Sequence, residues 1–234
     1  METTTTRVNK YLALQLGISR READELIEKG SVQINNQVAS LGSRVSSTDT
    51  VTVHGKPVAT DTQHRVILFH KPVGYVCSRK AQGSNPTIYD LLPPDMHPLK
   101  PAGRLDKDSS GLLLLTNDGD LAHQMMHPSF HKTKVYEVQL DKPLAPLHQQ
   151  MISDYGVQLE DGLSTFLVAT IDQVAPAAAN SAQKTYQITM HEGRNRQIRR
   201  TFAALGYTVT KLHRTQFGTY QLGSLQQAET RVLD

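Results

Sequence analysis

The stretch from Gly103 to Gly119 constrains the fold and the chemistry of this chain more than any other. It reads G-R-L-D-K-D-S-S-G, followed by four consecutive leucines and then T-N-D-G. An apolar run of this length between turn residues predicts a strand that is buried on both faces. Asp106 therefore lies in a loop just before a core strand, two positions after Arg104. Desolvation and a neighbouring cation can set the charge of a carboxylate placed there, so Asp106 is a candidate catalytic group.

Two other interpretations fit part of this stretch. Asp106 and Asp108, with Gly111 in sixth place, match the opening of a calcium-binding loop. The twelfth position is Asn117, however, where such loops use a bidentate glutamate, and the leucines predict a strand rather than a flanking helix. The second interpretation is a tight turn that Arg104 and Asp106 merely stabilise, and the local sequence alone leaves it open.

Composition predicts one domain of ordinary size with a small appendage. The chain has 234 residues, of which 38% are hydrophobic and 20% charged, a balance typical of a soluble protein with a real core. A single cysteine, Cys77, excludes an internal disulfide framework. The segment Met1–Arg7 lacks the apolar stretch of a secretion signal, and no run approaches membrane-spanning length. We therefore expect a cytoplasmic protein without a membrane partner.

Basic residues gather towards the C-terminus although the formal net charge is only +3. Between Glu192 and Arg214, six lysines and arginines accompany one acidic residue. A local excess of this size predicts contact with a polyanion, and the alternative is a solvated basic helix face. The six are Arg194, Arg196, Arg199, Arg200, Lys211 and Arg214.

The first fifty residues predict a small module of two helices and short strands. One helical face carries Val8, Tyr11, Leu12 and Leu16. Ser19–Glu22 reads S-R-R-E, a capping box that opens a second helix, and Gly30 ends it. Val32–Val38 predicts a strand, an Asn-Asn turn and a second strand, and the valines of 45–53 predict further short strands.

The remaining pattern predicts a larger second unit. The polar, turn-rich segment 55–63 is expected to be a linker, which divides the chain into residues 1–54, 55–63 and 64–234. Val66–Phe69, Tyr136–Leu140 and Tyr186–Met190 have strand patterns, and the unpatterned Ala175–Ser181 is expected to connect two strands. Ile198, Phe202 and Leu205 recur at helical spacing, which predicts a helix from about Asn195 to Gly206.

Several motifs together resemble those of the RNA pseudouridine synthases, in particular the RsuA/RluB/RluF branch. These are G-R-L-D at 103–106, K-P-x-G-x-x-x-S at 71–78, K-x-Y-E-V at 134–138, N-R-Q-I-R at 195–199 and L-x-R at 212–214. The N-terminal R-x-N-K, S-R-R-E-A and G-x-V-x-I-N motifs resemble the S-four-type RNA-binding module. The resemblance covers almost the whole chain. One departure is L-Q-Q-A-E at 225–229, where relatives commonly have a Pro-Gly-Glu turn, and it leaves the geometry of the last strand open.

The resemblance implies an α+β protein: a small ααβ N-terminal RNA-binding module and a mixed, mainly antiparallel catalytic sheet. It implies site-specific isomerisation of uridine to pseudouridine in ribosomal RNA, by a monomer without metal or nucleotide cofactor. The T-K-L-H-R-T-Q-F-G segment at 210–218 favours large-subunit RNA. Small-subunit RNA, transfer RNA and a non-catalytic assembly factor that binds ribosomal RNA remain alternatives.

The resemblance also implies roles for individual residues. Asp106 matches the catalytic nucleophile, and Tyr136 matches the ring that stacks on the target uracil and the candidate base for its carbon-five proton. Arg199 matches the ion-pair partner of the nucleophile. Ile198 would form the apolar floor beneath Tyr136, with Lys134 on the same strand face.

The remaining candidates would bind RNA. Arg104 would fill the base stack or hold a phosphate when the target base is extruded. An arginine-bearing helix N-terminus is a ready anion site, which supports RNA contact at the second helix, and a solvated helix face is the alternative. The candidate RNA contacts are Arg20, Arg21, Arg7, Lys10 and Lys29 in the module, and Arg194, Arg196 and Arg200 in the catalytic domain.

Overall fold

The computed structural model describes residues 5–58, 64–79, 82–171 and 185–233. The chain divides into two compact units. The first contains Met1–Arg65 together with the segments Pro93–Lys100 and Thr116–Gly119. The second contains Val66–Leu92, Pro101–Leu115 and Asp120–Asp234. Among the described residues, no helix has both the length and the apolar character needed to cross a membrane.

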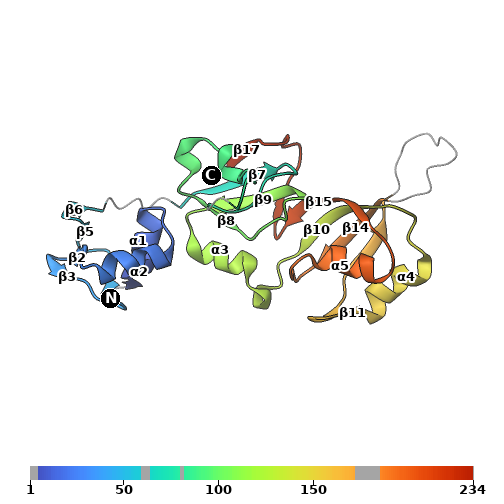
Figure 1. Ribbon diagram of the computed structural model, residues 1–234, viewed down its shortest axis with the longest axis horizontal. Helices are drawn as coiled ribbons and strands as arrows, with labels where there is room; N and C mark the ends of the chain where they lie inside the picture. Colours follow the sequence, from blue (N-terminus) through green and yellow to red (C-terminus); the bar gives the residue numbers. More distant parts are fainter. Residues whose placement is uncertain (1–4, 59–63, 80–81, 172–184, 234) are drawn as a thin grey trace. The chain divides into compact units, whose positions relative to one another are not determined.

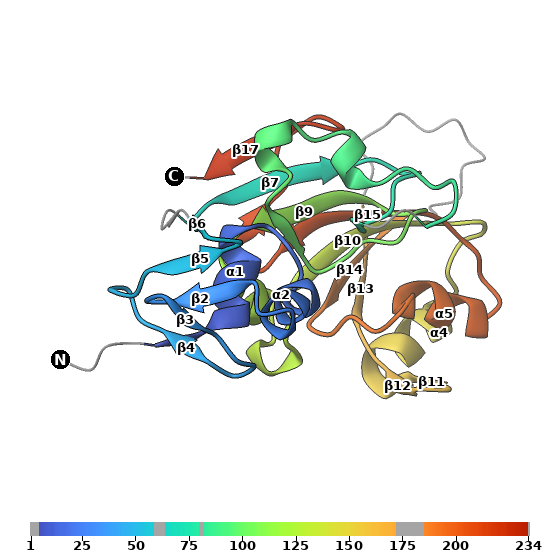
Figure 2. The same ribbon diagram turned by 60° about the vertical axis from the view of Figure 1, so that its left-hand side comes forward.

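The N-terminal unit has two helices that share an apolar core with a small antiparallel sheet (Figure 2). The strand order in this sheet is β3-β2-β5-β6, and β1 pairs separately with β4. The predicted ααβ module is confirmed. Its elements are β1 (Thr6–Arg7), α1 (Val8–Gln15), α2 (Arg20–Glu28), β2 (Val32–Ile34), β3 (Gln37–Val38), β4 (Arg44–Val45), β5 (Val51–Val53) and β6 (Lys56–Pro57).

Local signals in this unit are confirmed almost residue by residue. The Ser19 hydroxyl accepts from the Glu22 amide at 3.1 Å, and the Glu22 carboxylate accepts from the Ser19 amide at 2.7 Å, which completes the capping box. Asn35 and Asn36 have φ of 50° and 66°, as a two-residue hairpin turn requires. Only the placement of Leu16 is wrong, because it follows the last turn of α1 and is exposed.

The predicted linker begins with ordered strand. β6 pairs with β5 across a turn at His54 and Gly55, both with positive φ. The polar composition that predicts a linker also suits a hairpin turn, so the sequence pattern could not separate the two. Residues 59–63, and the expected connection at Ala175–Ser181, lie outside the described residues. The division of the chain at residues 1–54, 55–63 and 64–234 stays a prediction.

The second unit is built on a nine-stranded sheet (Figure 1). Its main path is β13-β14-β10-β15-β9-β7-β17, with β8 beside β9 and β16 beside β15. β15 and β9 are parallel, whereas β10, β13, β14, β16, β17 and their described partners are antiparallel, so the predicted mixed, mainly antiparallel sheet is confirmed.

From Val66 onwards the described chain consists of strands, short helices and helical turns. The strands are β7 (Val66–Lys71), β8 (Lys100–Ala102), β9 (Ser110–Thr116), β10 (Lys134–Leu140), β11 (Val157–Leu159), β12 (Gly162–Ser164), β13 (Leu167–Thr170), β14 (Thr185–Met190), β15 (Val209–Phe217), β16 (Tyr220–Gln221) and β17 (Thr230–Leu233). The helices are α3 (Gly119–Met126), α4 (Pro146–Gln150) and α5 (Gln197–Ala204), with 3₁₀ turns at Ile88–Asp90, Pro94–Met96 and Pro128–Phe130 and a π-helical turn at Met151–Tyr155.

Strand β9 lies at the centre of the apolar core. All seven of its residues are buried, as the run Leu112–Leu115 predicts. One apolar cluster joins β9 to α3 and β15, and a second joins β10 and β14 to α5 through Ile198 and Phe202. Figure 2 shows α5 beside the β10–β14 part of the sheet. The Asp106 turn therefore ends in the most deeply buried strand of the unit.

A β-bulge in β15 determines which of its side chains share a face. Val135 pairs with Gln216 and Tyr136 pairs with Arg214, so Thr215 is the extra residue. The bulge leaves Arg214 and Phe217 buried, three positions apart, although strands normally alternate with a period of two. On the other side Arg214 pairs with Gly111, where a Cβ would lie 2.2 Å from the Arg214 carbonyl oxygen. Only glycine allows this close approach.

The C-terminal departure from the Pro-Gly-Glu turn leaves the last strand regular. The Glu229 amide donates to the Gln226 carbonyl at 3.1 Å, and the Glu229 carboxylate accepts from the Gln226 amide at 2.9 Å. β17 then pairs with β7 in continuous register from Thr230 to Leu233. Ala228 has φ of 65° in this turn. This left-handed conformation costs a non-glycine residue about 1 kcal/mol.

We expect Ala228→Gly to raise the free energy of unfolding by about 1 kcal/mol, because glycine adopts a φ of 65° without the Cβ clash. Urea denaturation followed by far-UV circular dichroism measures the change. The matched control is Ala203→Gly in α5, where the exposed alanine has helical neighbours. That change should lower the free energy of unfolding by about 1 kcal/mol. Equal signs for the two variants would contradict the strain at Ala228.

Candidate active site

A buried lysine holds the turn that carries Asp106. The Ser109 amide donates to the Asp106 carbonyl at 3.0 Å, which closes the turn before β9. Lys71, at the end of β7, is fully buried, and its Nζ donates to the carbonyls of Asp106 (3.0 Å) and Ser109 (2.7 Å). Burial lowers the pKa of Lys71. The position of Asp106 is therefore fixed through its main chain, which leaves its carboxylate available.

The loop residue before Asp106 is also held by Cys77. The Cys77 thiol donates to the Leu105 carbonyl at 3.4 Å and accepts from the Leu105 amide at 3.5 Å. Burial raises the pKa of Cys77, which keeps the thiol protonated and able to donate. The contacts of Lys71 and Cys77 thus hold the Asp106 turn against the sheet.

Asp106 lies at a cavity of about 540 Å³ within the second unit. This volume falls in the range of about 300–1,000 Å³ that is usual for small-molecule sites. The lining combines apolar side chains with cations and two acidic groups. The lining includes Arg104, Asp106, Lys134, Tyr136, Glu192, Arg196, Ile198, Leu212, Arg214 and Phe217.

The cavity brings together most residues that the motifs single out. Tyr136 is 7% exposed on β10, and Ile198 is 5% exposed on α5. Lys134 lies on the same strand as Tyr136, and its Nζ donates to the His191 carbonyl at 3.1 Å. Desolvation lowers the pKa of Lys134. Arg104 is exposed at the same cavity. Sequence motifs that lie far apart along the chain therefore converge on one cavity.

The structure differs from the predicted pair between Arg199 and Asp106. Arg196 is the cation beside the carboxylate: its Nη1 lies 3.6 Å from Asp106 Oδ2. Arg199 instead places Nε 3.3 Å from Asp108 Oδ2 and donates to the Val209 carbonyl at 2.8 Å. The reason is local backbone, since Arg196 precedes α5 with φ of 46°, whereas Arg199 lies inside the helix. Arg199 is not among the residues that line the cavity.

Asp108 links the two arginines. Both of its oxygens accept from Arg196, at 3.1 and 3.0 Å, and its main-chain carbonyl accepts from Arg199 at 2.8 Å. Burial alone would raise the pKa of Asp108, but the hydrogen bond from Arg196 and the charges of Arg199 and Arg196 outweigh it. The pKa of Asp108 therefore lies below its ordinary value. Asp108 orients Arg196 towards Asp106.

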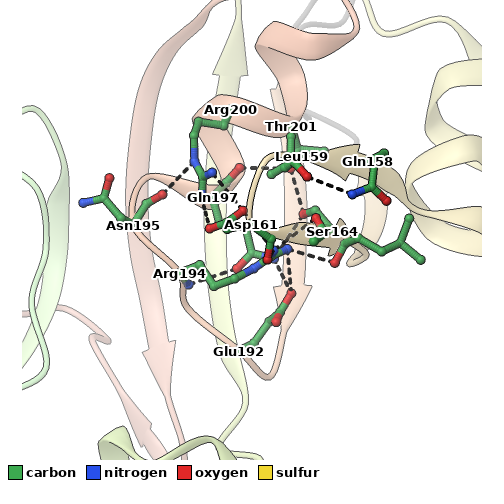
Figure 3. A network of polar contacts seen from close by, with 12 residues as sticks. Gln158, Leu159, Asp161, Ser164, Glu192, Arg194, Asn195, Gln197, Arg200 and Thr201 are labelled. Atoms are coloured by element: carbon green, nitrogen blue, oxygen red, sulfur yellow. Dashed lines mark hydrogen bonds and ion pairs between the residues drawn. The ribbon is translucent and has the colours of Figure 1, made fainter.

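A polar network holds the other two arginines of this motif (Figure 3). Arg194 and Arg200 converge on Asp161, with N–O distances of 3.0 and 2.7 Å. Gln197 accepts from the Arg194 amide at 3.1 Å and donates to the Ser164 hydroxyl at 3.1 Å and to Glu192. These contacts tie the β11–β12 hairpin to the loop before α5. Arg194 and Arg200, predicted to contact phosphate, are thus engaged within the protein.

The basic candidates of the N-terminal unit lie mostly in solvent. Arg7, Arg20, Arg21 and Lys29 are exposed, and Lys10 is half-buried. Arg20 donates to the Asn9 side chain at 3.4 Å. The two arginines at the start of α2 can therefore meet an anion.

Sequence reasoning missed two buried cations. Lys71 is part of the K-P motif, and its place at the end of an apolar strand was the signal that its ammonium would be buried. Arg214 follows Leu212 by two positions on β15, so the two share a strand face. The sequence placed Arg214 in the L-x-R motif and in the basic C-terminal patch without predicting its burial, yet it is 2% exposed and lines the cavity.

No group of three or more histidine, cysteine, aspartate or glutamate residues within the described part of the chain is arranged to hold a metal ion. The cavity instead offers one carboxylate beside an arginine, a buried phenol and an apolar wall. That set suits nucleophilic or acid–base chemistry on a flat, polar ring.

Comparison with known proteins agrees with this chemistry. The family model for RNA pseudouridylate synthase matches residues 65–204, and the S4 domain model matches residues 6–51. The chain belongs to the RNA pseudouridylate synthase family. The family and enzyme class predicted from the motifs are confirmed: this protein is a pseudouridine synthase with an N-terminal S4 domain.

Curated relatives match over most of this synthase. It is 34% identical over 228 residues to ribosomal large subunit pseudouridine synthase B of Bacillus subtilis, covering 97% of this chain and 91% of that protein. It is 38% identical to the protein of the same name from Pseudomonas aeruginosa, of which it covers 59%. It is also 36% identical to ribosomal small subunit pseudouridine synthase A of Vibrio vulnificus, covering 97% and 95%.

A solved structure supports the fold of this synthase. A crystal structure of a pseudouridylate synthase superposes with a TM-score of 0.68 at 29% identity, covering 97% of this chain and 96% of that one. The α+β fold predicted from the motifs is therefore confirmed.

We expect Asp108→Asn to lower the free energy of unfolding at pH 7 by less than about 1 kcal/mol, because the carboxylate is half-exposed and solvent screens its ion pairs. The lowered pKa sets the sign of the pH dependence. The stabilisation is present above the aspartate value of the unfolded chain, about 3.9, and is lost as the pH falls through the lower folded value.

Urea denaturation of wild type and Asp108→Asn, at pH 7 and at successively lower pH, measures the difference in their free energies of unfolding. The control is Asp154→Asn, an exposed aspartate with no ion pair among the described residues. Wild type and the control should stay parallel over the whole range. A wild-type advantage over Asp108→Asn that persists unchanged in acid would contradict the inferred pair.

Proposed function

We propose that this synthase converts specific uridines to pseudouridine in ribosomal RNA, with large-subunit RNA as the first substrate to test. The observation that carries the proposal is a carboxylate, Asp106, fixed by its main chain at a cavity that Tyr136 lines. Relatives named for the large and for the small ribosomal subunit match this chain with similar identity. Small-subunit RNA is therefore the second substrate, and the 210–218 segment is what favours the large subunit.

The chemistry requires few groups from the protein. Isomerisation breaks the bond between N1 and C1′ of the target uridine and forms a bond between C5 and C1′. The C5 proton leaves and N1 gains a proton, so no atom or electron pair is lost overall. Asp106 acts as the nucleophile: its carboxylate oxygen bonds to C1′ as the bond to N1 breaks, and this bond breaks again when C5 bonds to C1′, which restores the carboxylate. An isomerisation transfers no electrons and no group, so we propose that it needs no nucleotide or redox cofactor.

The cavity suits a base that has left its stack. Enzymes that act on a base inside paired RNA must extrude it into a pocket and contact both of its faces. We assign the Tyr136 ring to stack on the uracil and its hydroxyl to accept the C5 proton. Ile198 supports the apolar wall, and Lys134 lies at the edge where its ammonium can meet an oxygen of the nucleotide.

The role predicted for Arg199 alone is shared between Arg196 and Arg199. Arg196 places its guanidinium 3.6 Å from the Asp106 carboxylate and balances its negative charge at the cavity. Arg199 is 13% exposed and holds Asp108, which in turn orients Arg196. Arg199 is therefore proposed as a positioning residue that acts through Asp108.

RNA contacts are proposed at the exposed cations. Arg104 fills the base stack or holds a phosphate beside the cavity, and Arg20 and Arg21 bind phosphates at the start of α2. Arg7, Lys10 and Lys29 support them. Arg194 and Arg200 can reach a phosphate only in competition with Asp161. We further propose that the enzyme acts as a monomer in the cytoplasm.

We expect Asp106→Asn to abolish isomerisation while RNA affinity stays within a few-fold, because the carboxylate serves the bond exchange and not phosphate contact. The measurement is tritium release from carbon-five-labelled ribosomal RNA transcripts, with the modified site mapped by carbodiimide-dependent reverse-transcription stops. Asp154→Asn is the matched control and should retain full activity.

Two outcomes would oppose the proposal in different ways. Residual turnover of Asp106→Asn above a tenth of the wild-type rate would remove Asp106 from the reaction. Wild-type protein that binds either ribosomal RNA without releasing tritium would support a non-catalytic assembly factor instead.

We expect the double change Arg20→Ala, Arg21→Ala to weaken RNA binding and to reduce the slope of log affinity against log salt by about one to two, one for each lost phosphate contact. Turnover at saturating RNA should stay nearly unchanged. The control is Arg44→Ala in the same unit, whose guanidinium already donates to Thr5. Filter binding at several salt concentrations measures the slopes. Equal slopes for all three proteins would remove α2 from the RNA interface.

A further inference from the structure

Arg214 is a buried cation that lacks a counter-charge. It is 2% exposed, and among the described residues it forms no ion pair. Its Nε donates to the Leu112 carbonyl at 2.8 Å, and its guanidinium lies 4.7 Å from the centre of the Phe217 ring. Nη2 is buried and has no hydrogen-bond partner in the described part of the chain. Buried charged groups are normally paired or fully hydrogen-bonded, so this arrangement calls for an acceptor.

The surrounding strands hold Arg214 in place. Its backbone pairs with Tyr136 of β10 on one side and Gly111 of β9 on the other. The bulge at Thr215 lets the Phe217 ring and the guanidinium meet on one face. Arg214 also lines the cavity that holds Asp106 and Tyr136. The guanidinium is thus a fixed donor at the wall of the proposed base-binding site.

We propose that Arg214 donates a hydrogen bond to a carbonyl oxygen of the target uracil and stabilises the negative charge that the base acquires during the reaction. The inference rests on the proposed function and adds to it a residue that contacts the base. When the bond between N1 and C1′ breaks, its electron pair stays on the uracil and spreads over N1, O2 and O4. The charge disappears when C5 bonds to C1′, the C5 proton leaves and N1 is protonated.

Depth in the protein favours the base over the phosphate as the acceptor. An extruded nucleotide enters a pocket with its base first, and its phosphates remain near the backbone of the RNA. The exposed cations at this cavity are Arg104 and Arg196, and the Arg196 side chain is 44% exposed. Arg214 is almost fully buried beside Tyr136. A fixed donor in such a water-poor place is effective where charge develops in the transition state.

Sulfur substitution in the RNA tests this contact directly. A thiocarbonyl accepts hydrogen bonds poorly, so transcripts carry uridine, 2-thiouridine or 4-thiouridine at the mapped target. Single-turnover rates are measured for wild type, Arg214→Met and Arg214→Lys. We expect one of the two thio substitutions to slow wild type by about tenfold or more, the usual range for a hydrogen bond to a charged group. The same substitution should change the Arg214→Met rate by less than twofold.

Lysine should restore only part of the effect, because an ammonium lacks the planar fork of a guanidinium. The Arg214→Met rate on unmodified RNA should fall by a factor of about one hundred or more at saturating RNA, as for loss of an oxyanion donor. RNA affinity should stay within threefold. The control is Arg231→Met, an exposed arginine on β17, which should match wild type on all three transcripts.

Each result then decides between two statements. If each thio substitution slows wild type and the Arg214 variants by the same factor, the proposed contact is wrong. Circular dichroism checks the fold, and if Arg214→Met does not fold, the comparison of wild type with Arg214→Lys decides. A loss of affinity with an unchanged rate would identify a phosphate contact and overturn the proposal. Wild type that is inactive on uridine transcripts would refute the proposed function instead.

Discussion

The buried ammonium of Lys71 is the interaction on which the active site depends. It joins the end of β7 to the carbonyls of Asp106 and Ser109, so one lysine holds the loop that precedes the fully buried β9. Three carbonyl acceptors, the third from Pro72, satisfy a charge that would otherwise be costly to bury. Because these bonds use only the main chain of the turn, the carboxylate of Asp106 stays available for chemistry, and the Cys77–Leu105 contact steadies the turn from its other flank.

The arginine-rich loop before α5 supplies two separate electrostatic clusters. Arg196 and Arg199 meet Asp108 and, through Arg196, Asp106, whereas Arg194 and Arg200 meet Asp161. The first cluster sets the charge around Asp106. The second, shown in Figure 3, ties the β11–β12 hairpin to the loop and so fixes the edge of the cavity. The arginines that give this part of the sequence its positive charge therefore form ion pairs within the protein, and they also attract RNA.

The sheet brings a further cation to the site. The bulge at Thr215 and the close approach at Gly111 place Arg214 between β9 and β10, across from Tyr136. Lys71 and Arg214 are both buried, yet they differ in one respect. Lys71 has three carbonyl acceptors, whereas Arg214 has one, and its Nη2 has no partner among the described residues. Lys71 therefore stabilises the fold, whereas Arg214 keeps a donor available for an oxygen of the substrate.

The sequence by itself determined the features whose causes are local. The capping box at Ser19, the Asn35–Asn36 turn, the leucine strand and the family motifs each depend on neighbouring residues or on a short spacing. Tertiary structure decided which cations meet which acids, since Arg196 rather than Arg199 faces Asp106 and Asp161 holds Arg194 and Arg200. It also decided that β6 extends the N-terminal sheet and that Arg214 is buried. Long arginine side chains can reach several partners, and a single backbone φ at Arg196 or an extra residue in β15 changes which one they reach.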